Sequence, residues 1–205
     1  MIKSLVFDLD GTLVDSSTGI LLSMESAISS CCLPKVNLKP SLIGPPISSI
    51  FSTLYPDLSN NALSDLVSSF KSFYDNQYFN IVSPYDRTYE VLTLLRKKNV
   101  NLYIVTNKRE KPTRALIGSL GWGHLFEHVI CLDMLNDPFA VKSDALSLLI
   151  SQQSMDPALT PYVGDRYEDY LASRFNNMPF LFAIWGYGCI NRFNQDDSFK
   201  PLESM

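Results

Sequence analysis

The chain has 205 residues, of which 46% are hydrophobic and 19% are charged, and its formal net charge is −4. This length suits one sizeable domain or two small ones, and the slightly acidic balance gives no reason to expect nucleic acid or an anionic membrane as a partner. No apolar run approaches the ~18 residues that a membrane helix needs, and no signal peptide precedes the first strand, so we expect a cytoplasmic protein.

Five short apolar segments predict β-strands. They are rich in β-branched and aromatic residues and lack a clean polar alternation, which indicates strands that are covered on both faces, as in parallel sheets. The five segments lie near residues 4–9, 100–106, 128–132, 161–165 and 180–185.

Helical patterns separate the later strands. Asp86 is expected to be the N-cap of the first of these helices. Pro112 lies in the first turn of the second, and Gly121 ends it. Strands that alternate with helices predict an α/β fold, here a Rossmann-like doubly wound parallel sheet. The helical patterns cover residues 86–99, 111–121, 143–153 and 169–177.

Residues 16–79 do not follow this alternation. Apolar positions recur at helical spacing over residues 19–32 and 61–79, with a turn and a shorter helix between them, and no strand-like run intervenes. We therefore expect an inserted all-helical domain, 16–79, in an α/β core made of residues 1–15 and 80–205. The polar tail, residues 194–205, is expected to be loosely held.

Polar side chains stand where the predicted strands end. Ligands of open α/β sheets bind outside the carboxyl ends of the strands, so these side chains are candidates for a shared site. Lys142 stands just before a helical pattern and can reach the same edge. The residues at the strand ends are Asp8 and Asp10 after the first strand, Thr106 and Asn107 after the second, and Asp165 with the nearby Asp169 after the strand near 161–165.

Several carboxylates that converge on one place repel one another unless a cation holds them. Oxygen ligands suit Mg²⁺ better than zinc. Asp8 and Asp10 are two residues apart, so their side chains leave a strand on the same side. One carboxylate can attack phosphorus while the other handles a proton, and a lysine, a threonine hydroxyl and backbone N–H groups can bind the phosphoryl oxygens.

Four motifs in this sequence resemble those of the haloacid dehalogenase superfamily of phosphohydrolases, in the order in which that family has them. They are "DLDGT" from Asp8, "VTN" ending at Asn107, the single lysine Lys142, and "GDRYED" ending at Asp169. The resemblance implies the family's α/β core with a small helical cap at the insert. The segment "AIWGYG" at 183–188 is similar to phosphoglycolate phosphatase-like members.

The resemblance implies roles for the catalytic residues. Asp8 would be the nucleophile, and Asp10 the acid and base that protonates the leaving oxygen and later activates water. Lys142 would neutralise charge beside the nucleophile, although Lys108 in "TNK" is a rival for that role. Thr106 and the amide of Asn107 would bind the phosphate.

The resemblance also implies a Mg²⁺ site. Asp165 would be a direct ligand and Asp169 a ligand or a neighbouring carboxylate that fixes the site. Including the backbone carbonyl of Asp10, the metal-binding residues would be Asp8, Asp10, Asp165 and Asp169. Asn177 stands where relatives often have a glycine, and asparagine tolerates the left-handed conformation best among the other residues.

The implied function is a Mg²⁺-dependent phosphatase that acts on a small phosphorylated metabolite, as a monomer or weak homodimer. An idle regulator that binds a phosphate ligand or a partner protein is the alternative from another class. Asp10 disfavours a dehalogenase, since halide needs no proton on leaving. A phosphomutase is disfavoured because "SSTGI" after Asp15 lacks the histidine that such mutases carry.

Overall fold

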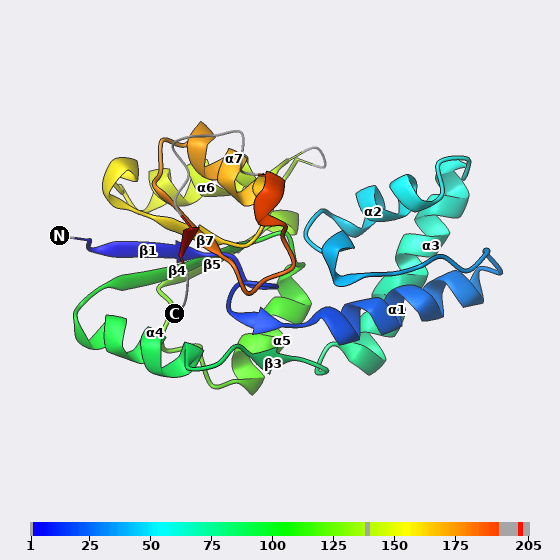
Figure 1. Cartoon of the computed structure of the whole chain (residues 1–205), viewed down its shortest axis with the longest axis horizontal. Helices are drawn as coiled ribbons and strands as arrows, with labels where there is room; N and C mark the ends of the chain where they lie inside the picture. Colours follow the sequence, from blue (N-terminus) through cyan, green and yellow to red (C-terminus); the bar gives the residue numbers. More distant parts are fainter. Residues whose placement is uncertain (1, 138–139, 193–200, 203–205) are drawn as a thin grey trace. The chain divides into compact units, whose positions relative to one another are not determined.

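A computed structural model describes residues 2–137, 140–192 and 201–202 (Figure 1). The chain forms two compact units: an α/β unit of residues 1–15 and 84–205, and a helical unit of residues 16–83. The chain crosses from one unit to the other after Asp15 and returns before Pro84. Most of the polar tail, 194–205, lies outside the described residues. No helix in the described ranges has the length and apolar character that a membrane span requires.

The centre of the α/β unit is a parallel sheet, in which the described residues form six strands in the order β5-β4-β1-β6-β7-β8. All five predicted strands are present, and the short β8 was not predicted. Strand β1 lies in the middle, where Phe7 pairs with Ile104 on one side and with Val163 on the other. The strands are β1 (Ser4–Phe7), β4 (Asn101–Thr106), β5 (His128–Cys131), β6 (Tyr162–Gly164), β7 (Phe180–Ala183) and β8 (Pro201–Leu202).

Helices cover both faces of this sheet (Figure 1). On one face, α6 and α7 pack over strand residues such as Val6 and Val105. The alternate strand residues Leu102 and Ile104 are also fully buried, and they point to the opposite face, where α4 and α5 lie. The predicted doubly wound α/β fold is therefore confirmed. The helices are α4 (Thr88–Lys97), α5 (Glu110–Ser119), α6 (Lys142–Gln152) and α7 (Tyr167–Phe175).

The ends of the helices test the local predictions. The prediction that Asp86 caps α4 was wrong: the N-cap residue is Arg87, which has φ 58° and no capping hydrogen bond from its side chain. The backbone N–H of Tyr85 donates to the Leu13 carbonyl oxygen, and a left-handed residue at Arg87 then leads the chain into the helix. Asn177 has φ 55°, as expected, and Gly121, with φ 68°, follows α5.

The helical unit contains α1 (Ser17–Ser30), α2 (Ile47–Leu54) and α3 (Asn60–Phe73), and α3 continues into a π-helical turn over Tyr74–Tyr78. Its aromatic side chains pack on one another: the Phe51 and Phe70 rings meet edge to face at 6.1 Å, and Phe70 stacks on Tyr74 at 5.7 Å. Leu66, one turn before Phe70, is fully buried. The insert thus has an apolar core of its own.

Short elements complete the described chain. A two-stranded sheet pairs β2 (Val14–Asp15) with β3 (Ser83–Pro84) and so includes residues at both crossings. The 3₁₀ helices are Pro40–Leu42, Leu132–Met134, Pro157–Leu159 and Ile190–Arg192.

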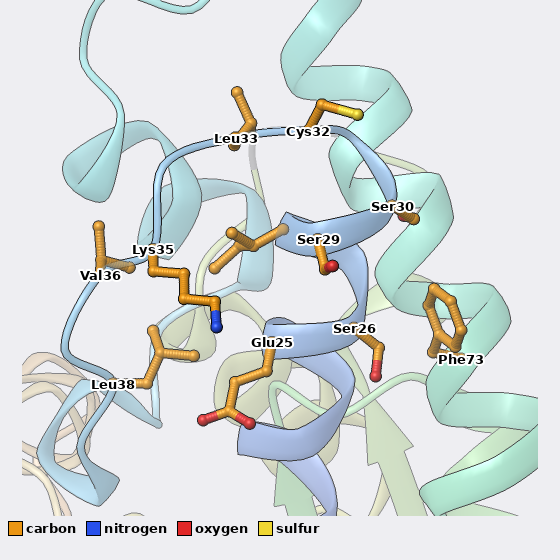
Figure 2. A pocket seen from close by; sticks show the side chains of 11 residues that line it. Glu25, Ser26, Ser29, Ser30, Cys32, Leu33, Lys35, Val36, Leu38 and Phe73 are labelled. Atoms are coloured by element: carbon orange, nitrogen blue, oxygen red, sulfur yellow. The ribbon is translucent and has the colours of Figure 1, made fainter.

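A cavity of about 790 Å³ lies within the helical unit, along α1 and the loop that follows it (Figure 2). Its lining mixes opposite charges, Glu25 and Lys35, with serine hydroxyls and apolar side chains such as Leu33 and Phe73. None of the candidate catalytic or metal-binding residues lines it, so this cavity is distinct from the site at the strand ends.

Candidate active site

Three carboxylates converge where neighbouring strands end. Asp8 directly follows β1, Asp165 directly follows β6, and Asp169 lies in the first turn of α7. One oxygen of each carboxylate lies within 4.8 Å of the other two. Because β1 and β6 are adjacent parallel strands, their carboxyl ends meet at the same edge of the sheet. Three of the four predicted metal-binding residues therefore form one cluster, which we call the carboxylate cluster.

Lys142 supplies the positive charge beside this cluster. It is the first residue of α6, and its Nζ lies 3.0 Å from Asp8 Oδ1 and 2.5 Å from Asp169 Oδ1. Burial lowers the pKa of Lys142, but Asp169 and Asp8 raise that pKa by more, so the amine stays protonated. The lysine thus joins the first strand of the unit to the first turn of α7.

One ammonium does not balance three carboxylates. Burial, with a further contribution from Asp169, raises the pKa of Asp8 to about 7, although Lys142 opposes the change. Burial followed by Asp169 and Asp8 raises the pKa of Asp165 well above its usual range. If all three acids were ionised, two negative charges would be left uncompensated beside Lys142. The cluster therefore needs further positive charge to stay ionised near neutral pH.

The residues present fit a divalent cation. The atoms that the carboxylate cluster offers to a metal are all carboxylate oxygens. Hard cations such as Mg²⁺ prefer oxygen ligands, whereas softer metals prefer other ligands. The uncompensated charge also matches that of one divalent ion. The geometry therefore supports a metal centre at Asp8, Asp165 and Asp169.

Asp10 lies in a different electrostatic environment from Asp8. Its two carboxylate oxygens lie 3.0 Å and 3.1 Å from Lys108 Nζ, and the side chain of that lysine is 6% exposed. The two lysines that rivalled each other in the sequence thus pair with different acids, Lys142 with Asp8 and Lys108 with Asp10. The side chain of Asp10 is not one of the three in the carboxylate cluster.

Thr106 is the last residue of β4 and Asn107 follows it, and β4 is the neighbour of β1 on the side opposite β6. Thr106 is buried, and its hydroxyl accepts a hydrogen bond of 3.2 Å from the backbone N–H of Lys108. This bond shapes the turn after β4, which brings Lys108 to Asp10. The two residues therefore lie at the same edge of the sheet as the carboxylate cluster.

Comparisons with known proteins now identify the family. The sequence profile of haloacid dehalogenase-like hydrolases matches residues 5–183, which is most of the chain. The chain belongs to this family. The resemblance read from its motifs is thereby confirmed, as is the prediction of a hydrolase of this family.

Individual relatives match most of the chain. A phosphoglycolate phosphatase of Xanthomonas campestris pv. campestris is 30% identical over 201 residues, which cover 95% of this chain and 87% of that protein. Pyrophosphatase PpaX of Bacillus velezensis is 28% identical over 175 residues, which cover 84% and 79%. The solved structure of a haloacid dehalogenase-like hydrolase from Streptococcus pneumoniae has a TM-score of 0.86 at 26% identity, covering 98% of this chain and 94% of that one.

Sequence reasoning missed several residues around the acids of this haloacid dehalogenase-like site. The Thr12 hydroxyl donates a hydrogen bond of 3.3 Å to Asp165 Oδ1, and the Tyr187 backbone N–H donates one of 2.7 Å to Asp165 Oδ2. The Tyr162 hydroxyl donates to the Val105 carbonyl oxygen at 3.1 Å and lies 3.5 Å from Asp169 Oδ1. Thr12 and Tyr187 belong to motifs that the sequence had singled out, but nothing local in either motif indicated contact with Asp165.

Proposed function

We propose that this haloacid dehalogenase-like hydrolase is a Mg²⁺-dependent phosphatase, which hydrolyses a small phosphomonoester through an aspartyl-phosphate on Asp8. The observation that carries the proposal is the placement of the Asp8 carboxylate, buried at the end of the central strand and 3.0 Å from Lys142 Nζ. A carboxylate held in this way can act as a nucleophile on phosphorus.

In the first step, an oxygen of Asp8 attacks phosphorus and forms a P–O bond, while the bond from phosphorus to the leaving oxygen breaks. Asp10 pairs with Lys108 in the substrate-free chain, so it takes up a proton when substrate binds and then gives that proton to the leaving oxygen. The product is a neutral alcohol. Lys142 balances charge on the Asp8 oxygen and the phosphoryl group. The Thr106 hydroxyl and the Asn107 amide bind the phosphoryl oxygens.

In the second step, water attacks the phosphorus of the aspartyl-phosphate. Asp10, now ionised, takes a proton from that water while the bond between phosphorus and the Asp8 oxygen breaks. Inorganic phosphate leaves, Asp8 is a carboxylate again, and Asp10 holds the proton taken from water. Lys108 keeps the ionised Asp10 carboxylate in one orientation for the proton transfer from water, since its ammonium contacts both oxygens.

Asp8, Asp165, Asp169 and the backbone carbonyl of Asp10 would hold the Mg²⁺ ion. The ion supplies positive charge that stabilises the phosphoryl group in the transition state. The charge imbalance of the carboxylate cluster supports this assignment, because a divalent cation would let all three acids stay ionised.

We propose that the helical unit acts as the cap and selects the leaving group. The phosphoglycolate phosphatase among the relatives makes 2-phosphoglycolate the first substrate to test, and pyrophosphatase PpaX makes pyrophosphate the second. A small phosphorylated metabolite as substrate, a cytoplasmic location and a monomer or weak homodimer remain predictions.

The test is hydrolysis by the full chain. An aryl phosphate is assayed with Mg²⁺, with excess chelator, and with Mg²⁺ restored, and a panel of phosphometabolites follows. We expect activity that chelation abolishes and Mg²⁺ restores. Full activity in excess chelator would contradict the metal assignment. Tight binding of a phosphometabolite with no hydrolysis of any substrate would instead favour the idle regulator.

A further inference from the structure

The segment Trp185–Gly188 lies against Asp165, whose carboxylate is fully buried. The Tyr187 backbone N–H donates to Oδ2 of that carboxylate at 2.7 Å, and the Thr12 hydroxyl donates to Oδ1 at 3.3 Å. Each oxygen therefore has a donor of its own, one from this segment and one from the loop after β1. These two bonds fix the rotation of the carboxylate about its own axis.

The same segment also holds Thr12. The indole N–H of Trp185 donates to the Thr12 carbonyl oxygen at 3.0 Å. Trp185 thus fixes the backbone of the residue whose hydroxyl reaches Asp165, and Tyr187 reaches Asp165 directly. The segment therefore reaches the carboxylate in two ways, directly through the Tyr187 N–H and indirectly through the bond from Trp185 to Thr12.

The two glycines of the segment are required by this close approach. A Cβ added at Gly186 would overlap the Cβ of Asp165 and the Gly11 carbonyl oxygen, and one added at Gly188 would overlap the Asp165 carbonyl oxygen. Any larger residue at these positions would push the segment away from Asp165. The alternation of aromatic residue and glycine in "WGYG" therefore places hydrogen-bond donors beside the acid without side chains in between.

The aromatic side chains tie this segment to the chain at both crossings. The Tyr187 hydroxyl donates to Asp15 Oδ1 at 3.0 Å, and Asp15 is the last residue of the α/β unit before the first crossing. The Trp185 ring packs edge to face on Tyr85 at 6.3 Å, and Tyr85 comes just after the second crossing. These contacts on both sides hold the segment, so its hydrogen-bond donors stay in place.

We propose that Trp185 and Tyr187 are positioning residues for the cation site, which act by holding Asp165 in the orientation that faces Asp8 and Asp169. The proposal rests on the proposed function, because it assumes that the carboxylate cluster binds Mg²⁺. Buried like charges repel, so an Asp165 freed from these bonds would turn away from the other two acids. Loss of a residue that orients a metal ligand typically weakens metal binding about 10–100-fold.

The experiment measures the dissociation constant of Mg²⁺ alone, by titration calorimetry on the full chain. Trp185→Phe keeps an aromatic ring but removes the indole N–H, and we expect about tenfold weaker Mg²⁺ binding. Tyr187→Phe keeps the backbone N–H to Asp165 and loses only the bond to Asp15, so a smaller, severalfold loss is expected. Trp122→Phe is the matched control: it alters a buried tryptophan that has no part in these contacts, and should leave the dissociation constant unchanged.

Enzyme activity measured at varied Mg²⁺ concentration distinguishes a positioning role from a general loss of folded protein. Trp185→Phe should need about tenfold more Mg²⁺ for half-maximal rate, and saturating Mg²⁺ should return kcat to near the wild-type value. Dissociation constants within twofold of wild type in both variants would overturn the inference, even if the wild type is a Mg²⁺-dependent phosphatase. Weaker Mg²⁺ binding in the variants of a protein that hydrolyses no phosphomonoester would overturn the proposed function alone.

Discussion

Two aspartates of one short motif lie in opposite electrostatic environments. Asp8 is buried beside two other acids, and Lys142 is the ammonium that contacts this cluster among the described residues, at Asp8 and Asp169. Asp10, two residues later, is paired with Lys108 through both of its oxygens. The first environment has an excess of negative charge, whereas the second is a balanced ion pair.

The difference shows that the charged residues around two identical side chains suit them to different chemical roles. A carboxylate in an overcharged cluster favours binding of a cation and is relieved when that cation arrives. A carboxylate held by its own lysine keeps a fixed orientation, which suits proton transfer to a defined atom. Variants that change one environment and leave the other intact can therefore test this contrast.

Removal of the nucleophile should have the largest effect. Asp8→Asn keeps the shape of the side chain but lacks the attacking oxyanion, so kcat should fall by several orders of magnitude while the fold persists. Asp57→Asn, at an exposed position in the helical unit, is the matched control and should keep full activity. Beryllium fluoride, which mimics an acyl phosphate, should form its adduct on Asp8 in a crystal structure. An adduct on Asp10 would reverse the two assigned roles.

Asp10→Asn should have a smaller effect that depends on the leaving group. General acid–base catalysis is worth roughly 10²–10⁴-fold, and an alkoxide needs the proton far more than an acidic phenol does. The first step should therefore slow much more with alkyl than with aryl phosphates, whereas hydrolysis of the aspartyl-phosphate should slow equally for both. Pre-steady-state bursts of released alcohol separate the two steps. An equal loss in alcohol release for both leaving groups would show that Asp10 is not the acid.

Lys108→Met tests the balanced pair itself. The variant keeps the length of the side chain but removes the ammonium that holds both oxygens of Asp10. Hydrogen bonds to charged groups are worth about 1.5–3 kcal/mol, so a loss of roughly 10- to 100-fold in kcat is expected. Lys111→Met, an exposed lysine on α5, is the matched control. If Lys108→Met lowered activity as far as Asp8→Asn does, Lys108 rather than Lys142 would be the lysine that supports the nucleophile.

The arrangement of strands and helices could be predicted because each has a recognisable pattern of apolar residues in its own stretch of sequence. Strands buried on both faces read as continuous apolar runs, as in β1 and β4, and their alternation with helices predicts a parallel sheet. The convergence of Asp8 with Asp165 could be predicted for the same reason, since parallel strands end at a common edge. The start of α4 could not, because Arg87 takes a left-handed conformation there and the nearby Tyr85 N–H bonds to Leu13, which is distant in sequence.

The contacts around Asp165 had no local signal at all. Trp185 meets Thr12 across 173 positions, and Tyr187 meets Asp15 across 172, so only the folded sheet brings them together. The choice between Lys142 and Lys108 was equally hidden. Both lysines have long side chains and stand near strand ends, and nothing local in the sequence shows which acid each one contacts.

The smallest expected effect is on stability, and it follows from the pKa of Asp8. Without a cation, burial raises this pKa from its usual 3.8 to about 7, so the folded chain keeps a proton that the unfolded chain releases. This contribution to stability is full below pH 3.8 and is lost as the pH rises to about 7. The raised pKa of Asp165 acts in the same direction.

Magnesium should reverse that loss, because it binds the ionised carboxylates. Saturating Mg²⁺ should therefore raise Tm by several degrees more at pH 8 than at pH 5, as measured by scanning calorimetry with chelator as the reference. Asp8→Asn removes one titrating acid from the overcharged cluster, so its metal-free Tm should vary less with pH. Lys108→Met leaves that cluster intact, so Mg²⁺ should raise its Tm by as much as in the wild type at both pH values. Equal Mg²⁺ increments at pH 5 and pH 8 in the wild type would mean that the cluster is not overcharged, and the contrast between Asp8 and Asp10 would fail.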